Sequence, residues 1–150
     1  MKKNSIDFCA GGLCLLLAFA LMSATDSAVI PMQGGLQASI ARGKQVYLQQ
    51  CLSCHQVDGL GVQGMTPPLV KTKFVLGDKT TLVKIVLNGM SGVEIAGGDY
   101  HGVMAAHTDL TDQQIADALT YVRNSWGNKA TAVTAAQVKA IRATNKPPAQ

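Results

Sequence analysis

The chain has 150 residues, of which 47% are hydrophobic and only 5% aromatic, and this length suggests one domain with short additions. The formal charge of +4 is mildly basic. The sequence does not predict a nucleic-acid-binding protein, because aromatic residues do not alternate with the lysines that cluster at Lys71, Lys73, Lys79 and Lys84. A solvated basic face is the simpler interpretation, and such a face could attract an acidic partner protein.

The N-terminus has the three parts of a secretory signal. Lys2 and Lys3 precede an apolar run from about Phe8 to Met22, and small and polar residues follow. The run is shorter than the ~20 residues that a membrane-spanning helix needs. The sequence therefore predicts a signal peptide over 1–24, cleaved after residue 24 or 28, and a periplasmic or otherwise exported protein that is not an integral membrane protein. An uncleaved segment that anchors the chain in the membrane is the alternative.

The first predicted helix follows a flexible segment. Residues 25–38 contain proline and a glycine pair, which predict a flexible lead-in. A helix is predicted from near Ser39 to about Gln50, because small and apolar residues share one face at helical spacing. Gly43 lies inside this helix. A glycine there lowers helix stability, so we expect close packing against another element at this position.

The middle of the chain predicts a long loop, a helix and a short turn region. The stretch from Cys51 to Phe74 is rich in glycine and contains a Pro-Pro pair, which predicts a loop. Asp78 is a suitable N-cap for a helix that Gly89 ends. The stretch 92–104 alternates weakly around a Gly-Gly pair, which indicates a small hairpin or a loop.

The clearest helix lies near the C-terminus. Thr111 and Gln114 form a capping box at its start, and Gly127 is expected to end it. A short last helix is predicted to begin near Thr134, within a C-terminal extension over 129–150 that ends in a frayed tail. The pattern predicts an all-α domain with long irregular loops. Loops this long in a small domain need something to pack against, which indicates a large cofactor.

The segment CLSCH, which begins at Cys51, is the attachment signature of c-type haem. Each thiol can add across one haem vinyl group, and His55 then lies where it can bind the iron. A zinc site would need more ligands, and only His101 and His107 could supply them. A disulfide suits an oxidising compartment but leaves His55 unexplained. The sequence therefore predicts one haem c per chain, bound covalently through Cys51 and Cys54.

From about Ser39 to Asn128 the chain resembles the class I c-type cytochromes. The matching stretches are GKQVYLQQCLSCHQVDGLG, PPL, VLNGMSG, YHGVM and LTDQQIADALTYVRNSWGN. The last four are most similar to the small periplasmic cytochrome c modules associated with bacterial dehydrogenases and copper nitrite reductases. The resemblance implies the class I cytochrome c fold over 39–128, with N- and C-terminal helices crossing beside the covalent haem and long loops wrapping it.

In that family a glycine and an aromatic residue before the first cysteine meet the C-terminal helix. Gly43 and Tyr47 occupy these positions here, and Ala118 and Tyr121 match the facing positions. The resemblance thus accounts for a glycine in the middle of a helix, because only a bare backbone permits so close a crossing.

The resemblance also implies a sixth iron ligand. Met104 falls where the family carries its axial methionine. The related modules usually have a proline directly after it, whereas Ala105 follows here, and this puts the rigidity of the loop in doubt. His101 or His107 could replace Met104 as the ligand. Met90 is interpreted as a packing residue at a helix end.

Other pocket residues follow from the same resemblance. Pro67 matches the family proline whose carbonyl accepts a hydrogen bond from the ring of the ligand histidine, here His55. Leu69 is expected to pack on the porphyrin. Tyr100 or Trp126 is expected to hydrogen-bond a haem propionate.

Together these inferences predict an electron carrier, not an enzyme. One haem with His55 and Met104 as axial ligands would shuttle single electrons between periplasmic or membrane-bound redox partners. These partners would be a dehydrogenase, a reductase or a terminal oxidase, and the chain could itself be an electron-transfer subunit of such an enzyme. The alternative is a haem enzyme or gas sensor whose sixth iron position is open or labile. Binding of carbon monoxide would distinguish the two.

Overall fold

A computed structural model of the chain describes residues 35–146 except residue 96. The predicted signal peptide over 1–24 and the first part of the predicted lead-in lie outside these residues. Within the part of the chain that is described, none of the helices combines the length and the apolar character needed to cross a membrane.

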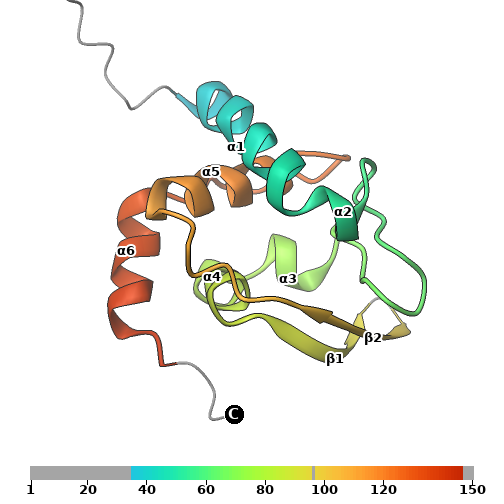
Figure 1. The fold of residues 1–150 in the computed structure, drawn as a ribbon. Helices are drawn as coiled ribbons and strands as arrows, with labels where there is room; N and C mark the ends of the chain where they lie inside the picture. The colour runs from blue at the N-terminus through green and yellow to red at the C-terminus, as the bar shows by residue number, and fades with distance from the viewer. Residues whose placement is uncertain (1–34, 96, 147–150) are drawn as a thin grey trace, which may run out of the picture. The chain divides into compact units, whose positions relative to one another are not determined.

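The described residues form six helices and one hairpin. Figure 1 shows α1 and α5 crossing above α3, α4 and the hairpin, while α6 lies to one side against α4 and α5. In chain order the elements are α1 (Leu36–Gln50), α2 (Leu52–His55), α3 (Lys73–Leu76), α4 (Lys79–Asn88), β1 (Met90–Ile95), β2 (Gly98–Met104), α5 (Asp112–Val122) and α6 (Ala135–Thr144).

The hairpin corrects the prediction of an all-α domain. Strands β1 and β2 pair antiparallel, with Met90 opposite Met104 and Ile95 opposite Gly98. A register shift between Ser91 and Val93 marks a bulge. The weak alternation of the sequence did indicate a hairpin or a loop here, and the β-branched and aromatic residues of these strands favour the hairpin.

The predicted caps are confirmed, and two helix ends differ from the prediction. Asp78, Thr111 and Thr134 each accept a hydrogen bond from a backbone N–H in the first turn of α4, α5 and α6. Helix α1 begins at Leu36 instead of Ser39. Gly35, its N-cap, is the nearest residue before Ser39 that disfavours a helix.

Helix α5 ends at Val122, before the predicted stop at Gly127. The chain turns early because the Asn128 side chain donates a hydrogen bond of 2.8 Å to the Val122 carbonyl. This bond adds to the longer one of 3.5 Å that the Ser125 N–H donates to the same carbonyl at the helix end.

The α1–α5 crossing depends on Gly43. A Cβ at this position would overlap the backbone carbonyl of Asp117 and crowd the Cβ of Tyr121. One helical turn later, the rings of Tyr47 and Tyr121 lie 5.3 Å apart. The crossing that the resemblance implied is therefore present, with Asp117 as the closest neighbour of Gly43 and Ala118 buried in the adjoining core.

Two apolar clusters support the fold. The larger lies among α1, α4, α5 and α6, and its buried members are Val46, Leu82, Val83, Leu87, Leu110, Ile115, Ala116, Ala118, Leu119, Val133 and Val138. The smaller is built on Tyr47, Val75 and Val122, and Cys51 and Trp126 pack against it. The smaller cluster thus lies directly beneath the first cysteine of the CLSCH motif.

Candidate functional site

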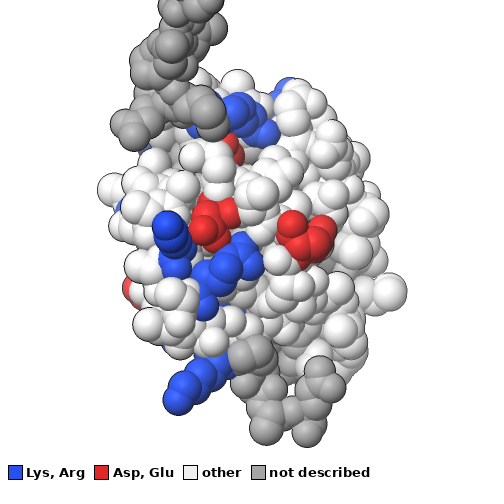
Figure 2. All heavy atoms as spheres, turned by 60° about the vertical axis from the view of Figure 1, so that its left-hand side comes forward, with Lys and Arg blue, Asp and Glu red and all other residues white. Residues whose placement is uncertain are grey.

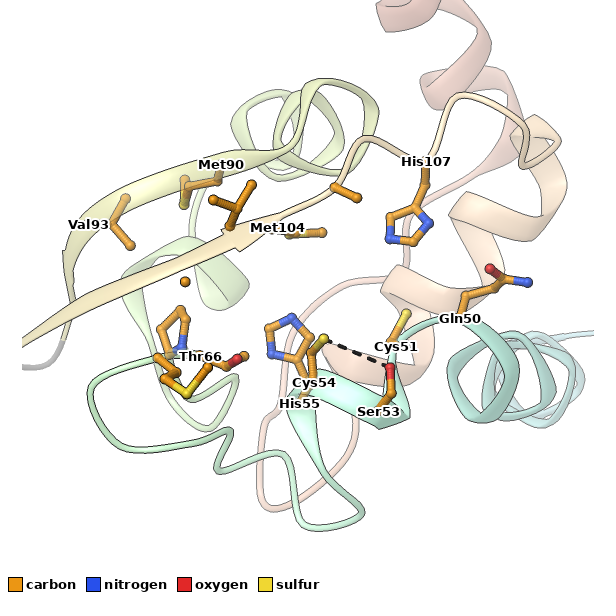
Figure 3. A pocket seen from close by; sticks show the side chains of 15 residues that line it. Gln50, Cys51, Ser53, Cys54, His55, Thr66, Met90, Val93, Met104 and His107 are labelled. Atoms are coloured by element: carbon orange, nitrogen blue, oxygen red, sulfur yellow. Dashed lines mark hydrogen bonds between the residues drawn. The ribbon is translucent and has the colours of Figure 1, made fainter.

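A cavity of about 290 Å³ opens between α2 and the hairpin. Figure 3 shows Cys51, Cys54 and His55 on the α2 side and Met90 and Met104 on the opposite side. A second, almost wholly apolar cavity of about 90 Å³ adjoins it. The two cavities share five lining residues, Cys51, His55, Pro67, Met90 and Met104.

Two aromatic side chains hold the end of α2 in place. The Tyr47 hydroxyl donates a hydrogen bond of 2.6 Å to the carbonyl of Gln56, the C-cap of α2. The Trp126 indole N–H donates a bond of 2.9 Å to the next carbonyl, that of Val57. The ring of Trp126 also lies over Gly59, where a Cβ would collide with it. Elements far apart in the sequence therefore fix the backbone just after His55.

Both cysteines of the motif are free thiols. Cys51 is partly buried and Cys54 is exposed. Burial, together with the nearby Cys54, raises the pKa of the Cys51 thiol to about 11. In the metal-free chain this thiol therefore stays protonated at neutral pH. Within the described residues, no cluster of three or more His, Cys, Asp or Glu side chains could hold a metal ion.

His55 presents a neutral, buried imidazole to both cavities. Its Nδ1 atom is buried and makes no hydrogen bond of good geometry to the rest of the described chain. Burial lowers the pKa of His55, the neighbouring Pro67 carbonyl opposes this effect, and nearby His107 adds to it. A neutral imidazole has a free nitrogen lone pair, as a metal ligand requires.

The hairpin brings two methionines to the other wall. Met90 and Met104 are direct cross-strand partners, and partners of this kind lie on the same face of a sheet. Both line both cavities. The sequence had assigned Met90 to a helix end, but α4 ends at Asn88 and Met90 is the first residue of β1. Only the pairing register, which is a long-range property, brings Met90 beside Met104.

The two histidines near Met104 differ in position. His107 lines the larger cavity, and its backbone N–H donates a bond of 2.9 Å to the Val86 carbonyl. The exposed His101 is not among the residues that line either cavity. Of the two alternative ligands considered from the sequence, His107 is therefore the one placed at the site.

Of the remaining predicted pocket residues, two line a cavity and two do not. Pro67 lines both cavities and Leu69 lines the apolar one. Tyr100 is buried but lines neither cavity. The indole N–H of Trp126 already donates a hydrogen bond to the Val57 carbonyl.

Sequence reasoning missed the apolar wall formed by α3 and α4. Its members are Phe74, Val75, Leu82, Ile85 and Val86. The apolar face of α4 was visible in the sequence, but nothing local indicated that it would meet the loop carrying Pro67.

The residues at this site fit a haem group. Two thiols and a neutral imidazole lie on one wall, and the thioethers of Met90 and Met104 lie on the other, so these residues could attach a haem covalently and supply iron ligands. The apolar lining between the walls suits a large, flat and mostly apolar group. The Pro67 carbonyl neighbours the buried His55 imidazole, and a backbone acceptor at this place could orient a ligand histidine.

Comparisons with known proteins agree with this geometry. The cytochrome c family model matches residues 40–126. Cytochrome c-552 of Thermus thermophilus is 34% identical over 127 residues, which cover 78% of this chain and 85% of that protein.

Two further relatives are parts of dehydrogenases. The cytochrome c subunit of the quinone alcohol dehydrogenase of Gluconacetobacter polyoxogenes is 37% identical over 121 residues, or 77% of this chain and 25% of that subunit. The cytochrome c subunit of gluconate 2-dehydrogenase from Pantoea cypripedii is 36% identical over 112 residues, or 67% and 24% of the two chains. This chain thus matches about a quarter of each of these subunits.

Proposed function

This chain belongs to the cytochrome c family, and we propose that it is a single-electron carrier with one haem c, bound through Cys51 and Cys54 and ligated by His55 and Met104. One observation carries the proposal. Two free thiols and a buried neutral imidazole share a cavity with the Met104 side chain on its opposite wall.

The bound haem would supply a one-electron couple between ferric and ferrous iron. The chain's own residues set the conditions for that couple. Burial keeps the His55 ring neutral, and the Pro67 carbonyl can fix its orientation. The soft, neutral thioether of Met104 favours the reduced metal relative to a second imidazole. The apolar wall that includes Leu69 limits access of water, which also favours the less charged state.

The proposed partners are redox proteins. Two relatives carry the names of cytochrome c subunits of quinone alcohol dehydrogenase and gluconate 2-dehydrogenase. We infer that this chain exchanges electrons with a dehydrogenase, a reductase or a terminal oxidase outside the cytoplasm. Residues 39–128 would form the haem domain, preceded by a signal peptide and followed by the extension that contains α6.

Covalent attachment is tested by extracting the denatured protein with acidified acetone. We expect the haem colour to stay with the chain, because thioether bonds survive unfolding. Cys51→Ala and Cys54→Ala should each weaken retention, and the double variant should lose haem entirely. Ser53→Ala, between the two cysteines, serves as the matched control. Complete loss of haem from the wild type would contradict the proposal.

Ligation by Met104 is tested on the oxidised protein by its weak sulfur-to-iron absorption band at the red edge of the spectrum. Met104→Ala should abolish this band, lower the reduction potential and admit carbon monoxide. His107→Ala and His101→Ala should keep the band. If the band persists in Met104→Ala, another sulfur must be the ligand. Met90 is then the nearest candidate, because it is the cross-strand partner of Met104. A wild-type protein that lacks the band and binds carbon monoxide freely would favour the enzyme or gas-sensor alternative.

A further inference from the structure

The segment that leaves Met104 has few backbone hydrogen bonds of its own, and Leu110, near its end, is its one buried residue. Residues 105–111 connect β2 to α5 without regular structure and are mostly exposed. In the described part of the chain, the backbone N–H groups of 105–110 make one hydrogen bond to another backbone group, from His107 to Val86. Ala105 follows Met104, so no proline restricts the backbone there. Between Met104 and Leu110 the segment is therefore loosely held, and without further contacts it would let Met104 move away from the cavity.

Helix α6 supplies the missing attachment through Arg142. Its guanidinium donates bonds of 3.2 Å to the Thr108 carbonyl and 2.6 Å to the Leu110 carbonyl. It also pairs with the Asp112 carboxylate at 2.7 Å. One planar side chain thus spans the end of the segment and the first turn of α5. The pair is about two-thirds buried, with 31% and 29% of the side chains exposed, and such charge-assisted contacts are stronger than neutral ones.

The same helix also holds the other side of the hairpin. Asn145, the C-cap of α6, exchanges two hydrogen bonds with Asn88, at 3.2 and 2.7 Å. Asn88 is the last residue of α4, and Met90 follows after one glycine. Helix α6 is itself fixed to the core by Val138, which is fully buried. Its two attachments therefore lie at the entrance to β1 and at the exit from β2, on either side of the Met90–Met104 pair.

We propose that α6 positions the Met104 side chain, with Arg142 holding the segment that leaves it so that the sulfur seldom withdraws from the cavity. The inference rests on the proposed ligation by Met104. Arg142 touches neither the cavity nor a group that would be bound there, so it is a positioning residue. It performs the role that a proline after the methionine would perform by restricting the backbone.

Carbon monoxide binding to the reduced protein measures how often Met104 withdraws, because the gas binds only when the sixth position opens. We expect Arg142→Gln, which keeps much of the side-chain length but loses the charge and the planar fork, to increase the binding rate on the order of 10-fold. Asn145→Ala should raise the rate by a smaller factor and provides a second variant should Arg142→Gln fold poorly.

The controls separate local release from general loss of stability. Asp117→Asn weakens the α1–α5 crossing without contacting residues 105–111, and Lys139→Ala alters an exposed position on α6. Both should bind carbon monoxide at the wild-type rate, although Asp117→Asn should unfold at a lower temperature. In Arg142→Gln the sulfur-to-iron band should fade well below the temperature at which the helices melt.

Three results would overturn the inference, and they are distinguishable. A wild-type protein without the sulfur-to-iron band would remove the ligation by Met104 and the role of α6 with it. A wild-type band together with an unchanged binding rate in both Arg142→Gln and Asn145→Ala would leave the proposed function intact and refute the positioning role alone. A rate in Asp117→Asn as high as in Arg142→Gln would also refute it, because the effect would then follow global stability.

Discussion

The Tyr47 hydroxyl joins the first helix to the segment that carries the haem motif. Burial is the main reason why the pKa of Tyr47 is raised well above its usual range, so the phenol remains a neutral donor to the Gln56 carbonyl. Its ring packs against both Tyr121 and Trp126, with centroids 5.3 Å away in each case. The residue therefore contributes through both its hydroxyl and its apolar ring.

Tyr47→Phe removes the hydroxyl and keeps the ring. We expect a loss of about 1 kcal/mol or somewhat more in the free energy of unfolding, since the Gln56 carbonyl loses its partner in a partly buried site. Tyr121→Phe is the matched control, because within the described residues the Tyr121 hydroxyl makes no hydrogen bond. Urea unfolding of the two variants measures the difference, and equal losses would show that the hydrogen bond from Tyr47 to Gln56 adds no stability of its own.

The pKa of Asp117 determines part of the way in which the stability of the fold depends on pH. Burial alone would raise its pKa, but hydrogen bonds from Arg42, Ser39 and Gln113 outweigh burial and hold the pKa below the usual value. A group with a lowered folded pKa stabilises the fold above its unfolded pKa, about 3.9 for Asp. That stability is lost as the pH falls through the lower, folded value.

We therefore expect the melting temperature of the wild type to fall as the pH drops below about 4. Asp117→Asn should melt lower at neutral pH and show a smaller further fall on acidification. Asp109→Asn controls for the loss of one exposed carboxylate. Thermal melts at a series of pH values provide the measurement, and parallel curves for wild type and Asp117→Asn would show that other groups dominate the acid response.

At the scale of elements, the close approach of α1 and α5 depends on one residue, Gly43. Gly43→Ala should gain about 1 kcal/mol from helix propensity. The added methyl group, however, overlaps the Asp117 carbonyl, which belongs to backbone that cannot simply rotate away. Overpacking of this kind costs about 1–3 kcal/mol or more. We expect a net loss of stability by chemical denaturation, whereas Lys44→Ala, exposed on the same helix, should be nearly neutral. A stabilised Gly43→Ala protein would show that the helices separate easily.

The sequence predicted those elements whose signals are local. The capping boxes at Thr111 and Thr134 predicted the starts of α5 and α6, because cap and partner lie within one helical turn. The four-residue helices α2 and α3 are too short for a periodic pattern. The resemblance placed Gly43 at the crossing, but no local pattern reveals the Asp117 carbonyl against it.

The site was predicted to a similar extent and for the same reason. Cys51, Cys54 and His55 stand in one contiguous motif, so their proximity is inherent in the sequence. The position of Met90 depends on strand register, and the role of Arg142 depends on contacts that reach 30 or more residues back along the chain. Interactions of this range leave no pattern in a single sequence.

At the scale of the whole molecule, the distribution of charge bears on how partners approach. On the face shown in Figure 2, basic and acidic side chains lie close together and uncharged surface surrounds them. The residues that line the larger cavity include no Lys, Arg, Asp or Glu. Met65 and Val103 at this cavity are 61% and 79% exposed. An encounter at the cavity would therefore bury apolar surface and depend little on long-range attraction.

Electron self-exchange between oxidised and reduced copies of this protein tests that expectation without an external partner. If two copies meet at their cavities, Val103→Lys places like charges opposite each other and should slow self-exchange on the order of 10-fold at low salt. Added salt should recover part of the rate, because it screens the repulsion. The wild-type rate should change little with salt.

Val57→Lys is the matched control, since Val57 is 75% exposed but lines neither cavity. Line broadening in NMR spectra of mixed redox states gives the rates. Equal slowing by the two lysines would mean that net charge, and not the surface around the cavity, governs the encounter.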